Sequence, residues 1–283
     1  MKTEKILIVG ASGTVGSEVV RLLRNECYEV SATTQKPVES GDRSKVHVNL
    51  ATGEGLGAAF EGIDRAFLLS PPGYADQYGI LSPLIQEAKR WGLKKVVLMT
   101  AMGANAVETS PFRKAEIELE KSGLPYNIIR PNWFFQNFNT FWVQGIRELG
   151  KIQLPAGFAQ VSFIDARDVS AVAAKLLATD DSENEAFDLS GPEAIDHNDV
   201  AKAISLATGR KVEYQDIAPE TLKQGLVAAG LPVDYVNFMI LIFGFLREGY
   251  NAGVNSNVRK ILGRDAHGLK KYIQDYQASW VIT

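Results

Sequence analysis

Cysteine is almost absent from the sequence, and the single Cys27 has no partner for an intramolecular disulfide. The most apolar run, residues 238–246, is much shorter than the roughly 20 residues of a membrane-spanning helix. Neither charge sign dominates, since 30 basic and 33 acidic residues give a net charge of −3, whereas nucleic-acid-binding domains usually carry a basic face. No apolar signal core precedes the first predicted strand. We therefore expect a cytoplasmic protein that binds neither membranes nor nucleic acids.

The remaining composition is that of an ordinary globular protein, with 46% hydrophobic and 22% charged residues among 283. The first part of the chain alternates short β-branched runs with helical patterns. Strands are expected at 5–9, 30–34, 46–49, 66–69, 95–100 and 126–130, and helices at 17–26, 55–60, 78–91 and 111–121. This alternation predicts an α/β fold, a Rossmann-like doubly wound parallel sheet, whose ligand site lies beyond the carboxyl ends of the strands.

The pattern changes after Arg130 and becomes mostly helical. The sequence predicts an aromatic-rich helix at 133–149, a strand at 161–164, and a helix at 169–178 that Asp168 caps. Further strands are expected at 186–189 and 212–217, and helices at 196–208, 219–230, 232–249, 257–263 and 269–280. We predict a dinucleotide-binding domain at 1–150 and a smaller α-rich C-terminal lobe for the substrate at 151–283. Residues from about 161 to 190 are expected to return to the main sheet.

A glycine-rich turn joins the first predicted strand to the first helix. Gly10 allows a tight turn, Gly13 lets a diphosphate approach the backbone, and Gly16 lets the helix pack against the strand. Free N–H groups and the positive end of the helix dipole then face the anion. The predicted phosphate-binding residues are Gly10, Ser12, Gly13, Thr14, Val15 and Gly16. The alternative is a turn that binds no ligand.

Several segments carry a resemblance to a known family. They are IVGASGTVG (8–16), FLLSPPG (67–73), VVLMTAMGA (96–104), PFRKAEIELEKSGLPYNIIRPNWFFQNF (111–138) and VSFIDARDVSAV (161–172). Together they resemble the NmrA-like, NAD(P)H-binding subgroup of the atypical short-chain dehydrogenases/reductases. The resemblance implies a nicotinamide cofactor, and it implies either a reductase of quinones, azo compounds or iminium ions, or a redox-sensing regulator.

The end of the second predicted strand selects between the two nicotinamide cofactors. An acidic residue there would bind the ribose hydroxyls of NAD, but none occurs before Glu39. Lys36 and Arg43 are candidates to neutralise the 2′-phosphate of NADP, so NADP is favoured and NAD stays open. The further predicted cofactor contacts are Thr33, Thr34, Gln35, Lys36, Asn49, Leu50, Ser70, Pro71, Pro131 and Trp133.

The catalytic tyrosine of ordinary short-chain dehydrogenases is missing, because none of the nine tyrosines has a lysine four residues after it. Lys114 stands where the resemblance places the family lysine, which implies a hydrogen bond to the nicotinamide ribose. The alternative is a surface lysine paired with Glu118. Thr100 stands where classical relatives keep a serine that polarises the substrate carbonyl. Its alternative role is structural, and we weigh both equally.

Without a tyrosine acid, an easily reduced acceptor is favoured, since positioning alone supplies much of the catalysis of hydride transfer. We predict an NAD(P)H-dependent oxidoreductase that acts, as a monomer or a homodimer, on an aromatic or conjugated acceptor of the quinone, azo or imine type. A non-catalytic NAD(P)-binding redox sensor is the alternative, and an enzyme like the sugar-nucleotide epimerases ranks lower. The three histidines are far apart, so no metal site is expected. The predicted substrate pocket comprises Ala101, Met102, Trp133, Phe134, Phe138 and Phe158.

Overall fold

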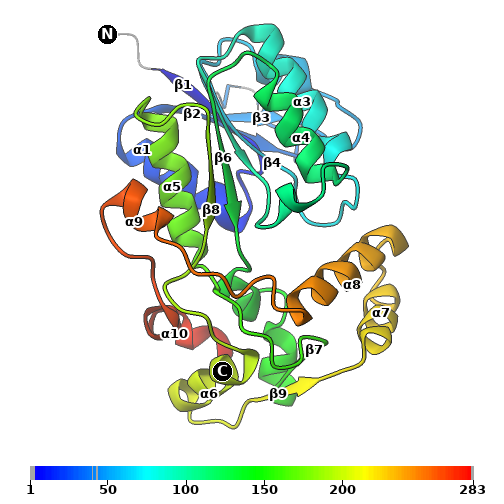
Figure 1. Ribbon diagram of the computed structural model, residues 1–283. Helices are drawn as coiled ribbons and strands as arrows, with labels where there is room; N and C mark the ends of the chain where they lie inside the picture. Colours follow the sequence, from blue (N-terminus) through cyan, green and yellow to red (C-terminus); the bar gives the residue numbers. More distant parts are fainter. Residues whose placement is uncertain (1–3, 40, 43, 282–283) are drawn as a thin grey trace. The chain divides into compact units, whose positions relative to one another are not determined.

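The computed structural model describes residues 4–39, 41–42 and 44–281. The chain forms two compact units (Figure 1). The first, which we call the sheet unit, runs to Pro131 and includes Val169–Asp188. The second, which we call the α-rich unit, comprises Asn132–Asp168 and the chain from Leu189 onward. The first boundary therefore falls earlier than the predicted residue 150.

The sheet unit is built on seven strands in the order β3-β2-β1-β4-β5-β6-β8. The register of β1 with β2 and β4, and of β4, β5 and β6 in turn, is parallel, which confirms the predicted Rossmann-like fold. The strand order reverses between β1 and β4, the switch point where such sheets bind ligands. The strands are β1 (Lys5–Ile8), β2 (Glu29–Thr34), β3 (Lys45–His47), β4 (Arg65–Leu69), β5 (Lys95–Met99), β6 (Tyr126–Pro131) and β8 (Glu185–Leu189).

Helices cover both faces of this sheet, with α1 and α5 on one side and α3 and α4 on the other (Figure 1). Because both faces are covered, the central strands are continuous apolar runs: Ile6, Leu7 and Ile8 of β1 are completely buried. The helices associated with the sheet are α1 (Thr14–Asn25), α2 (Leu56–Ala59), α3 (Gln77–Trp91), η1 (Ala104–Ala106), α4 (Pro111–Glu120) and α5 (Ala166–Ala178).

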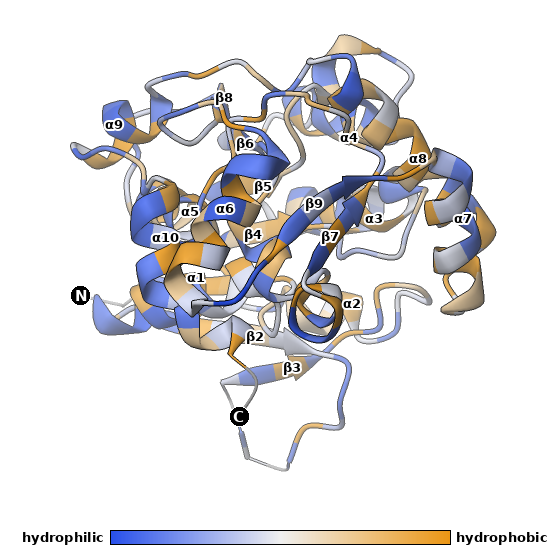
Figure 2. Cartoon of the chain, turned by 90° about the horizontal axis from the view of Figure 1, so that it is seen from below, coloured by the Kyte–Doolittle hydropathy of each residue, from blue (hydrophilic) through white to orange (hydrophobic). Residues whose placement is uncertain are grey.

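The α-rich unit contains a small parallel sheet of β7 (Lys151–Leu154) and β9 (Glu213–Asp216). In Figure 2 most residues of β9 are hydrophilic, whereas many residues of α8 are hydrophobic. The hydrophobic core of the α-rich unit includes the buried rings of Phe135, Phe163 and Trp280. The other elements are η2 (Phe135–Asn139), η3 (Gly145–Leu149), α6 (His197–Thr208), α7 (Pro219–Ala228), α8 (Val233–Arg247), α9 (Asn257–Leu262), α10 (Leu269–Tyr276) and η4 (Gln277–Trp280).

Two predicted elements after Arg130 are wrong, and for a third, the helix at 169–178, the predicted start and cap are wrong. The expected long helix at 133–149 is two short pieces, a 3₁₀ turn and a π-helical turn, and Thr140 interrupts them with φ −125° and ψ −85°. The expected strand at 161–164 contributes only isolated bridges, one of them between Phe134 and Ile164. Helix α5 begins at Ala166, so Asp165 caps it and Asp168 lies in its first turn.

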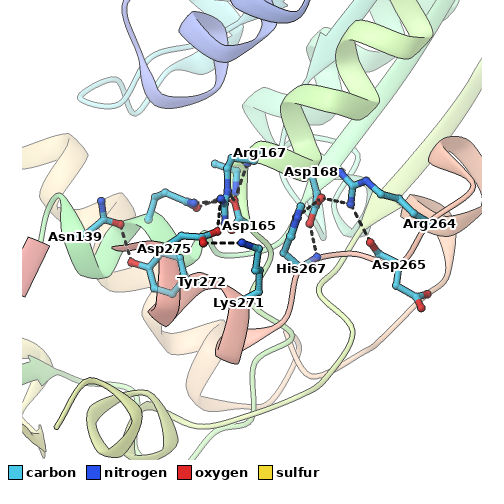
Figure 3. A network of polar contacts seen from close by, with 12 residues as sticks. Asn139, Asp165, Arg167, Asp168, Arg264, Asp265, His267, Lys271, Tyr272 and Asp275 are labelled. Carbon is cyan, nitrogen blue, oxygen red and sulfur yellow. Dashed lines mark hydrogen bonds and ion pairs between the residues drawn. The ribbon is translucent and has the colours of Figure 1, made fainter. Parts of the chain in front are cut away.

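Two buried aspartates hold the C-terminal segment of the α-rich unit in place (Figure 3). The carboxylate of Asp168 accepts hydrogen bonds from the backbone N–H of His267 at 2.6 Å and from Arg264 at 2.7 Å. The carboxylate of Asp165 accepts from Arg167, which also pairs with Asp275 at 2.6 Å. Both carboxylates are fully occupied by donors of their own unit, which fits a structural role better than acid–base chemistry. In the part of the chain that the structure describes, no helix has both the length and the apolar character needed to cross a bilayer.

Candidate functional site

The glycine turn between β1 and α1 has the geometry that a phosphate-binding loop requires. Gly10 has φ +71°, and a Cβ there would lie 2.7 Å from the side chain of Leu69. A Cβ on Gly16 would lie 2.3 Å from the carbonyl oxygen of Gly10, so the helix approaches the turn too closely for any side chain. A Cβ on Gly13 would meet only that same oxygen, at an ordinary 3.4 Å. Packing within the protein therefore accounts for the need for glycine at positions 10 and 16. The Cβ position of Gly13, in contrast, has space around it.

The N-terminus of α1 is open to solvent. Ser12, Gly13 and Thr14 are exposed, and no side chain among the described residues caps the helix. Its first turn contains no acidic residue. The first N–H groups of a helix have no partner within it, and the helix dipole concentrates positive potential there. Unfilled donors and accessible backbone make this terminus suited to a diphosphate.

Thr33 shapes this turn rather than standing free. Its hydroxyl, at the end of β2, accepts a hydrogen bond from the N–H of Gly10 at 3.1 Å, and only 8% of the residue is exposed. The sequence predicted Thr33 as a direct cofactor contact. In the structure the side chain of Thr33 instead supports the backbone of the loop.

The end of β2 presents polar, exposed groups next to the glycine turn. The hydroxyl of Thr34 accepts from the backbone N–H of Lys36 at 3.0 Å, and the side chains of Gln35 and Lys36 are exposed. Arg43, the other cation considered from the sequence, lies outside the described residues. Lys36 is therefore the cation that can be placed at this strand end.

A small cavity lies beside the end of β3. It measures about 160 Å³ and is lined by Leu50 and its neighbours up to Gly53, by Leu56 of α2, and by residues of α3 from Gly79 to Leu84. Asn49 orders the loop that forms one wall, because its side-chain oxygen accepts from the N–H of Ala51 at 3.0 Å. Among the described residues the amide nitrogen of Asn49 has no partner, and Asn49 is one of the cofactor contacts that the sequence predicts.

The other predicted contacts of the sheet unit fall at the carboxyl ends of its strands. Ser70 and Pro71 follow β4 and are half-buried. Ala101 and Met102 follow β5, and the N–H of Met102 donates to the carbonyl of Pro131 at 3.0 Å. The structure thus brings these residues to the edge of the sheet that also carries the glycine turn.

Lys114 lies on the first turns of α4 and is exposed. The pair with Glu118 considered from the sequence does not form, because Glu118 Oε1 accepts from Gln86 at 3.3 Å and its Oε2 has no partner in the described part of the chain. Ser110, four residues before Lys114, is the non-helical cap of α4; its hydroxyl donates to the carbonyl of Ala104 at 2.9 Å. Lys114 is thus available to a ligand, whereas the hydroxyl of Ser110 is engaged.

Thr100 belongs to a buried polar network that was not predicted from the sequence. Its hydroxyl donates to Glu116 at 2.7 Å, and Glu116 also accepts two hydrogen bonds from Arg130, each 2.8 Å. Glu116 is completely buried and only 5% of Thr100 is exposed. Of the two roles weighed for Thr100, this placement favours the structural one. An acidic residue between the buried Ala115 and Leu119 on α4 was the available signal.

The predicted aromatic residues of the α-rich unit differ in accessibility. Phe138 is completely buried against Phe163, with ring centroids 5.4 Å apart, so it belongs to the core. Trp133 is half-buried and packs on Phe243 at 4.9 Å, and Phe134 is half-buried too. Phe158 is 80% exposed and is the ring of this set most accessible to a ligand.

The other groove and the possible metal ligands of the described residues were also compared with the predicted site residues. An open groove of about 620 Å³ runs along α6 and β9 of the α-rich unit, and none of the predicted site residues lines it. No group of three or more histidine, cysteine or acidic residues among those described is arranged to hold a metal ion.

Comparison with known proteins identifies the family. Residues 2–276 match the NmrA-like family. The NAD(P)H azoreductase of Xenophilus azovorans is 33% identical over 286 residues, covering 97% of this chain and 99% of the azoreductase. Quinone oxidoreductase 2 of Escherichia coli is 24% identical and covers 80% of this chain and 82% of its own. The Citrobacter sp. triphenylmethane reductase complexed with NADP(H) shares the fold, with a TM-score of 0.80 and 20% identity over 96% of this chain and 99% of the reductase. The chain belongs to the NmrA-like family, as its sequence motifs predicted.

Proposed function

We propose that this protein is an NAD(P)H-dependent oxidoreductase that transfers hydride to a conjugated, aromatic acceptor. The observation that carries the proposal is the open N-terminus of α1, with exposed Ser12, Gly13 and Thr14 beside a turn that its own packing has shaped. The similarity to an NAD(P)H azoreductase and a quinone oxidoreductase supports the reaction class.

The diphosphate of the cofactor would bind the N–H groups of this helix terminus. The adenine would lie near Asn49 and the cavity beside Leu50, whose volume of about 160 Å³ can hold a flat heterocycle. Lys36, exposed at the end of β2, would neutralise a 2′-phosphate. Since no acidic residue precedes Glu39 on this segment, we propose NADPH over NADH. The similarity to a fold solved with NADP(H) agrees with this choice.

Lys114 would hold the nicotinamide ribose through its ammonium group, since no ion pair with Glu118 competes for it. The cofactor, when bound, supplies the hydride. The buried hydrogen bond between Thr100 and Glu116 would join α4 to the end of β5. It would thereby fix the position of Lys114 relative to the sheet.

The absence of an acid at the usual place defines the acceptor class. No tyrosine stands four residues before Lys114, and the hydroxyl of Ser110 already donates to the carbonyl of Ala104. Quinones and azo compounds accept hydride without a strong enzymatic acid because water can protonate the product, and an iminium ion becomes a neutral amine with no proton needed.

The test is turnover with a panel of acceptors. Purified protein is mixed with NADPH or NADH and with a naphthoquinone, an azo dye and a cyclic iminium compound, and cofactor oxidation is followed. We expect oxidation of NADPH with at least one conjugated acceptor, and a loss of preference for NADPH in Lys36→Gln. Tight NADPH binding without turnover of any acceptor would contradict the enzyme and favour a redox sensor.

A further inference from the structure

The groove along α6 and β9 lies entirely within the α-rich unit, and none of the residues that we propose to bind the cofactor lines it. Its volume is about 620 Å³, and Figure 2 shows α6 next to β9. One wall is a stripe of α6 that includes Ala201, Lys202 and Ser205, and the other is formed by residues 211–215. An occupant of this groove would therefore contact a helix on one side and a strand on the other.

The strand β9 has a free edge on the side away from β7. The N–H of Glu213 donates to the carbonyl of Gly150 at 2.9 Å, and that of Ile217 donates to the carbonyl of Leu154 at 3.3 Å. Because the backbone groups of a strand alternate between its two sides, the N–H and C=O of Tyr214 point away from β7. In the described part of the chain, β9 pairs with β7 alone, and the backbone of Tyr214 has no other partner.

The helix α6 covers this edge only at its beginning. The hydroxyl of Ser205 accepts a hydrogen bond from the N–H of Val212 at 2.8 Å, whereas Tyr214 lines the groove. The side chain of Tyr214 is already engaged, because its ring stacks on His197 with centroids 5.3 Å apart and its hydroxyl accepts from the N–H of Ala156. What Tyr214 offers to an occupant is therefore its main chain.

The side chains of β9 do not protect its edge. Edge strands that stay unpaired usually carry a lysine, a proline or a charge that repels a further strand. The sequence of β9 is EYQD, which contains neither lysine nor proline. Its two acidic side chains are neutralised, since Glu213 pairs with Lys211 and Asp216 pairs with Arg247. Another strand could therefore pair with this edge without meeting an uncompensated charge on β9.

The charge of the groove indicates which kind of strand would pair there. Three lysines from separate segments line it: Lys151 of β7, Lys202 of α6 and Lys211 before β9. The one acidic residue of the lining, Glu213, pairs with Lys211. Lys151 and Lys202 have no ion pair among the described residues, in a chain whose net charge is −3. An acidic occupant is favoured, and a second copy of this groove is disfavoured because it would bring lysines together.

We propose that this groove binds an extended acidic peptide segment of a partner protein, which adds a strand to the free edge at Tyr214. A residue of an added antiparallel strand can exchange both of its backbone hydrogen bonds with Tyr214. Acidic side chains of the peptide would lie beside Lys151 and Lys202. Leu206, which is 79% exposed on α6 and lines the groove, offers a contact for an apolar side chain. The proposal does not depend on the proposed function, since it involves neither the cofactor nor the acceptor.

The experiment uses a short synthetic peptide in which glutamate and valine alternate, labelled with fluorescein, and measures its Kd by fluorescence anisotropy. We expect saturable binding that added salt weakens. Lys151→Gln and Lys202→Gln should each raise the Kd about two- to fivefold, the effect of one surface ion pair. Lys270→Gln is the matched control and should keep the wild-type Kd, because Lys270 is exposed on α10 and does not line the groove.

Two further probes separate strand pairing from attraction between charges. The same peptide with methylated backbone nitrogens keeps its charge but loses its N–H donors, so it should bind about tenfold more weakly or not at all. A single-stranded oligothymidylate of the same charge has no peptide backbone and should also bind about tenfold more weakly or not at all. Equal affinity for either probe would overturn the proposal, because the groove would then attract any polyanion.

Amide hydrogen exchange, followed by NMR, locates the bound peptide. The N–H of Tyr214 should exchange about tenfold more slowly or less when the peptide saturates the protein, whereas that of Glu213, already bonded to Gly150, should change little. No saturable binding, an unchanged Kd in both lysine variants, or an unprotected Tyr214 would each overturn the proposal. Self-association that protects Tyr214 without peptide would overturn it as well, because the occupant would then be a second copy of the chain.

Discussion

The hydroxyl of Thr33 accepts a hydrogen bond from the backbone N–H of Gly10 at 3.1 Å, which joins the end of β2 to the turn after β1. Two neighbouring strands thus set the shape of the loop that we propose binds the diphosphate. Because the hydroxyl of Thr33 is buried and engaged with this backbone N–H, we expect it to act on the cofactor through the backbone of the loop.

Thr33→Val should therefore weaken NADPH binding without touching the cofactor. The substitution keeps the shape of the side chain but leaves the N–H of Gly10 without its acceptor, which costs about 1–3 kcal/mol. If part of this cost falls on the bound form of the loop, the Kd for NADPH rises about tenfold. Thr33→Ser, which keeps the hydroxyl, should bind nearly as wild type. Equal affinities of the valine and serine variants, measured by calorimetry, would show that the contact is irrelevant to binding.

Lys114→Ala should lower kcat/KM for NADPH-dependent reduction roughly ten- to hundredfold, the loss of one hydrogen bond from a charged donor. Its melting temperature should stay at the wild-type value, because the exposed ammonium makes no ion pair with Glu118. Lys121→Ala is the matched control, since Lys121 is exposed at the other end of α4. A similar loss of activity in both variants would argue against a specific role for Lys114.

Glu116→Ala should destabilise the protein by about 3–5 kcal/mol, because the buried Arg130 loses two short hydrogen bonds and keeps the longer contact with Asp188 at 3.6 Å. Glu120→Ala is the control on the same helix. Glu120 pairs with Arg113 at 2.6 Å, but its side chain is 29% exposed, and such pairs contribute at most about 1 kcal/mol. The free energy of unfolding of each variant is measured by urea titration followed by circular dichroism. Equal destabilisation by the two substitutions would mean that the buried network is not the stronger contact.

His197 should make stability depend on pH in the acid range. Burial lowers the pKa of His197 from 6.5 to about 4, and neither ring nitrogen has a partner among the described residues. The unfolded chain protonates this histidine near pH 6.5 and the folded one only near 4, so unfolded molecules bind more protons between these values. This contribution to stability is complete above about pH 6.5 and is lost as the pH falls toward 4, by at most about 3 kcal/mol.

His197→Leu removes the titrating group, and its stability should fall less steeply than that of the wild type between pH 6.5 and 4. At pH 7 the variant should be as stable as the wild type or more so, because it buries no unpaired nitrogen. Parallel stability curves for His197→Leu and the wild type would refute the assignment.

The sheet unit was predictable because its signals are local. The strands β1 and β4 are largely apolar runs that a glycine or a proline follows within two residues, and the glycine spacing after β1 has few structural explanations. The turn around Gly10 and Gly16 could therefore be placed from the sequence. The supporting role of Thr33 could not, because the direction of a side chain at the end of a strand depends on the neighbouring strand.

The α-rich unit was harder to predict, because its segments are fixed by contacts that are distant in sequence. The aromatic spacing from Trp133 onward is helical, but Thr140 breaks the backbone and Phe138 turns into a core built with residues such as Phe163 and His197. The buried Glu116 was missed for the same reason: its partners Thr100 and Arg130 lie on two other elements.

The central claim, that the open end of α1 binds a nicotinamide dinucleotide, is tested most directly at Gly13. Gly13 is the N-cap of α1 with φ −83°, and the space around its Cβ position holds only the oxygen of Gly10 at 3.4 Å. Aspartate and asparagine are both favoured at such a cap, so both variants should fold and melt at or above the wild-type temperature.

The measurement is a calorimetric titration of NADPH into the wild-type protein, Gly13→Asn and Gly13→Asp. We predict binding by the wild type, weaker binding by Gly13→Asn, and no measurable binding by Gly13→Asp, because its carboxylate occupies the helix terminus and repels the diphosphate. NADPH binding by Gly13→Asp with wild-type affinity, or no binding of NADPH or NADH by the wild type, would contradict the claim.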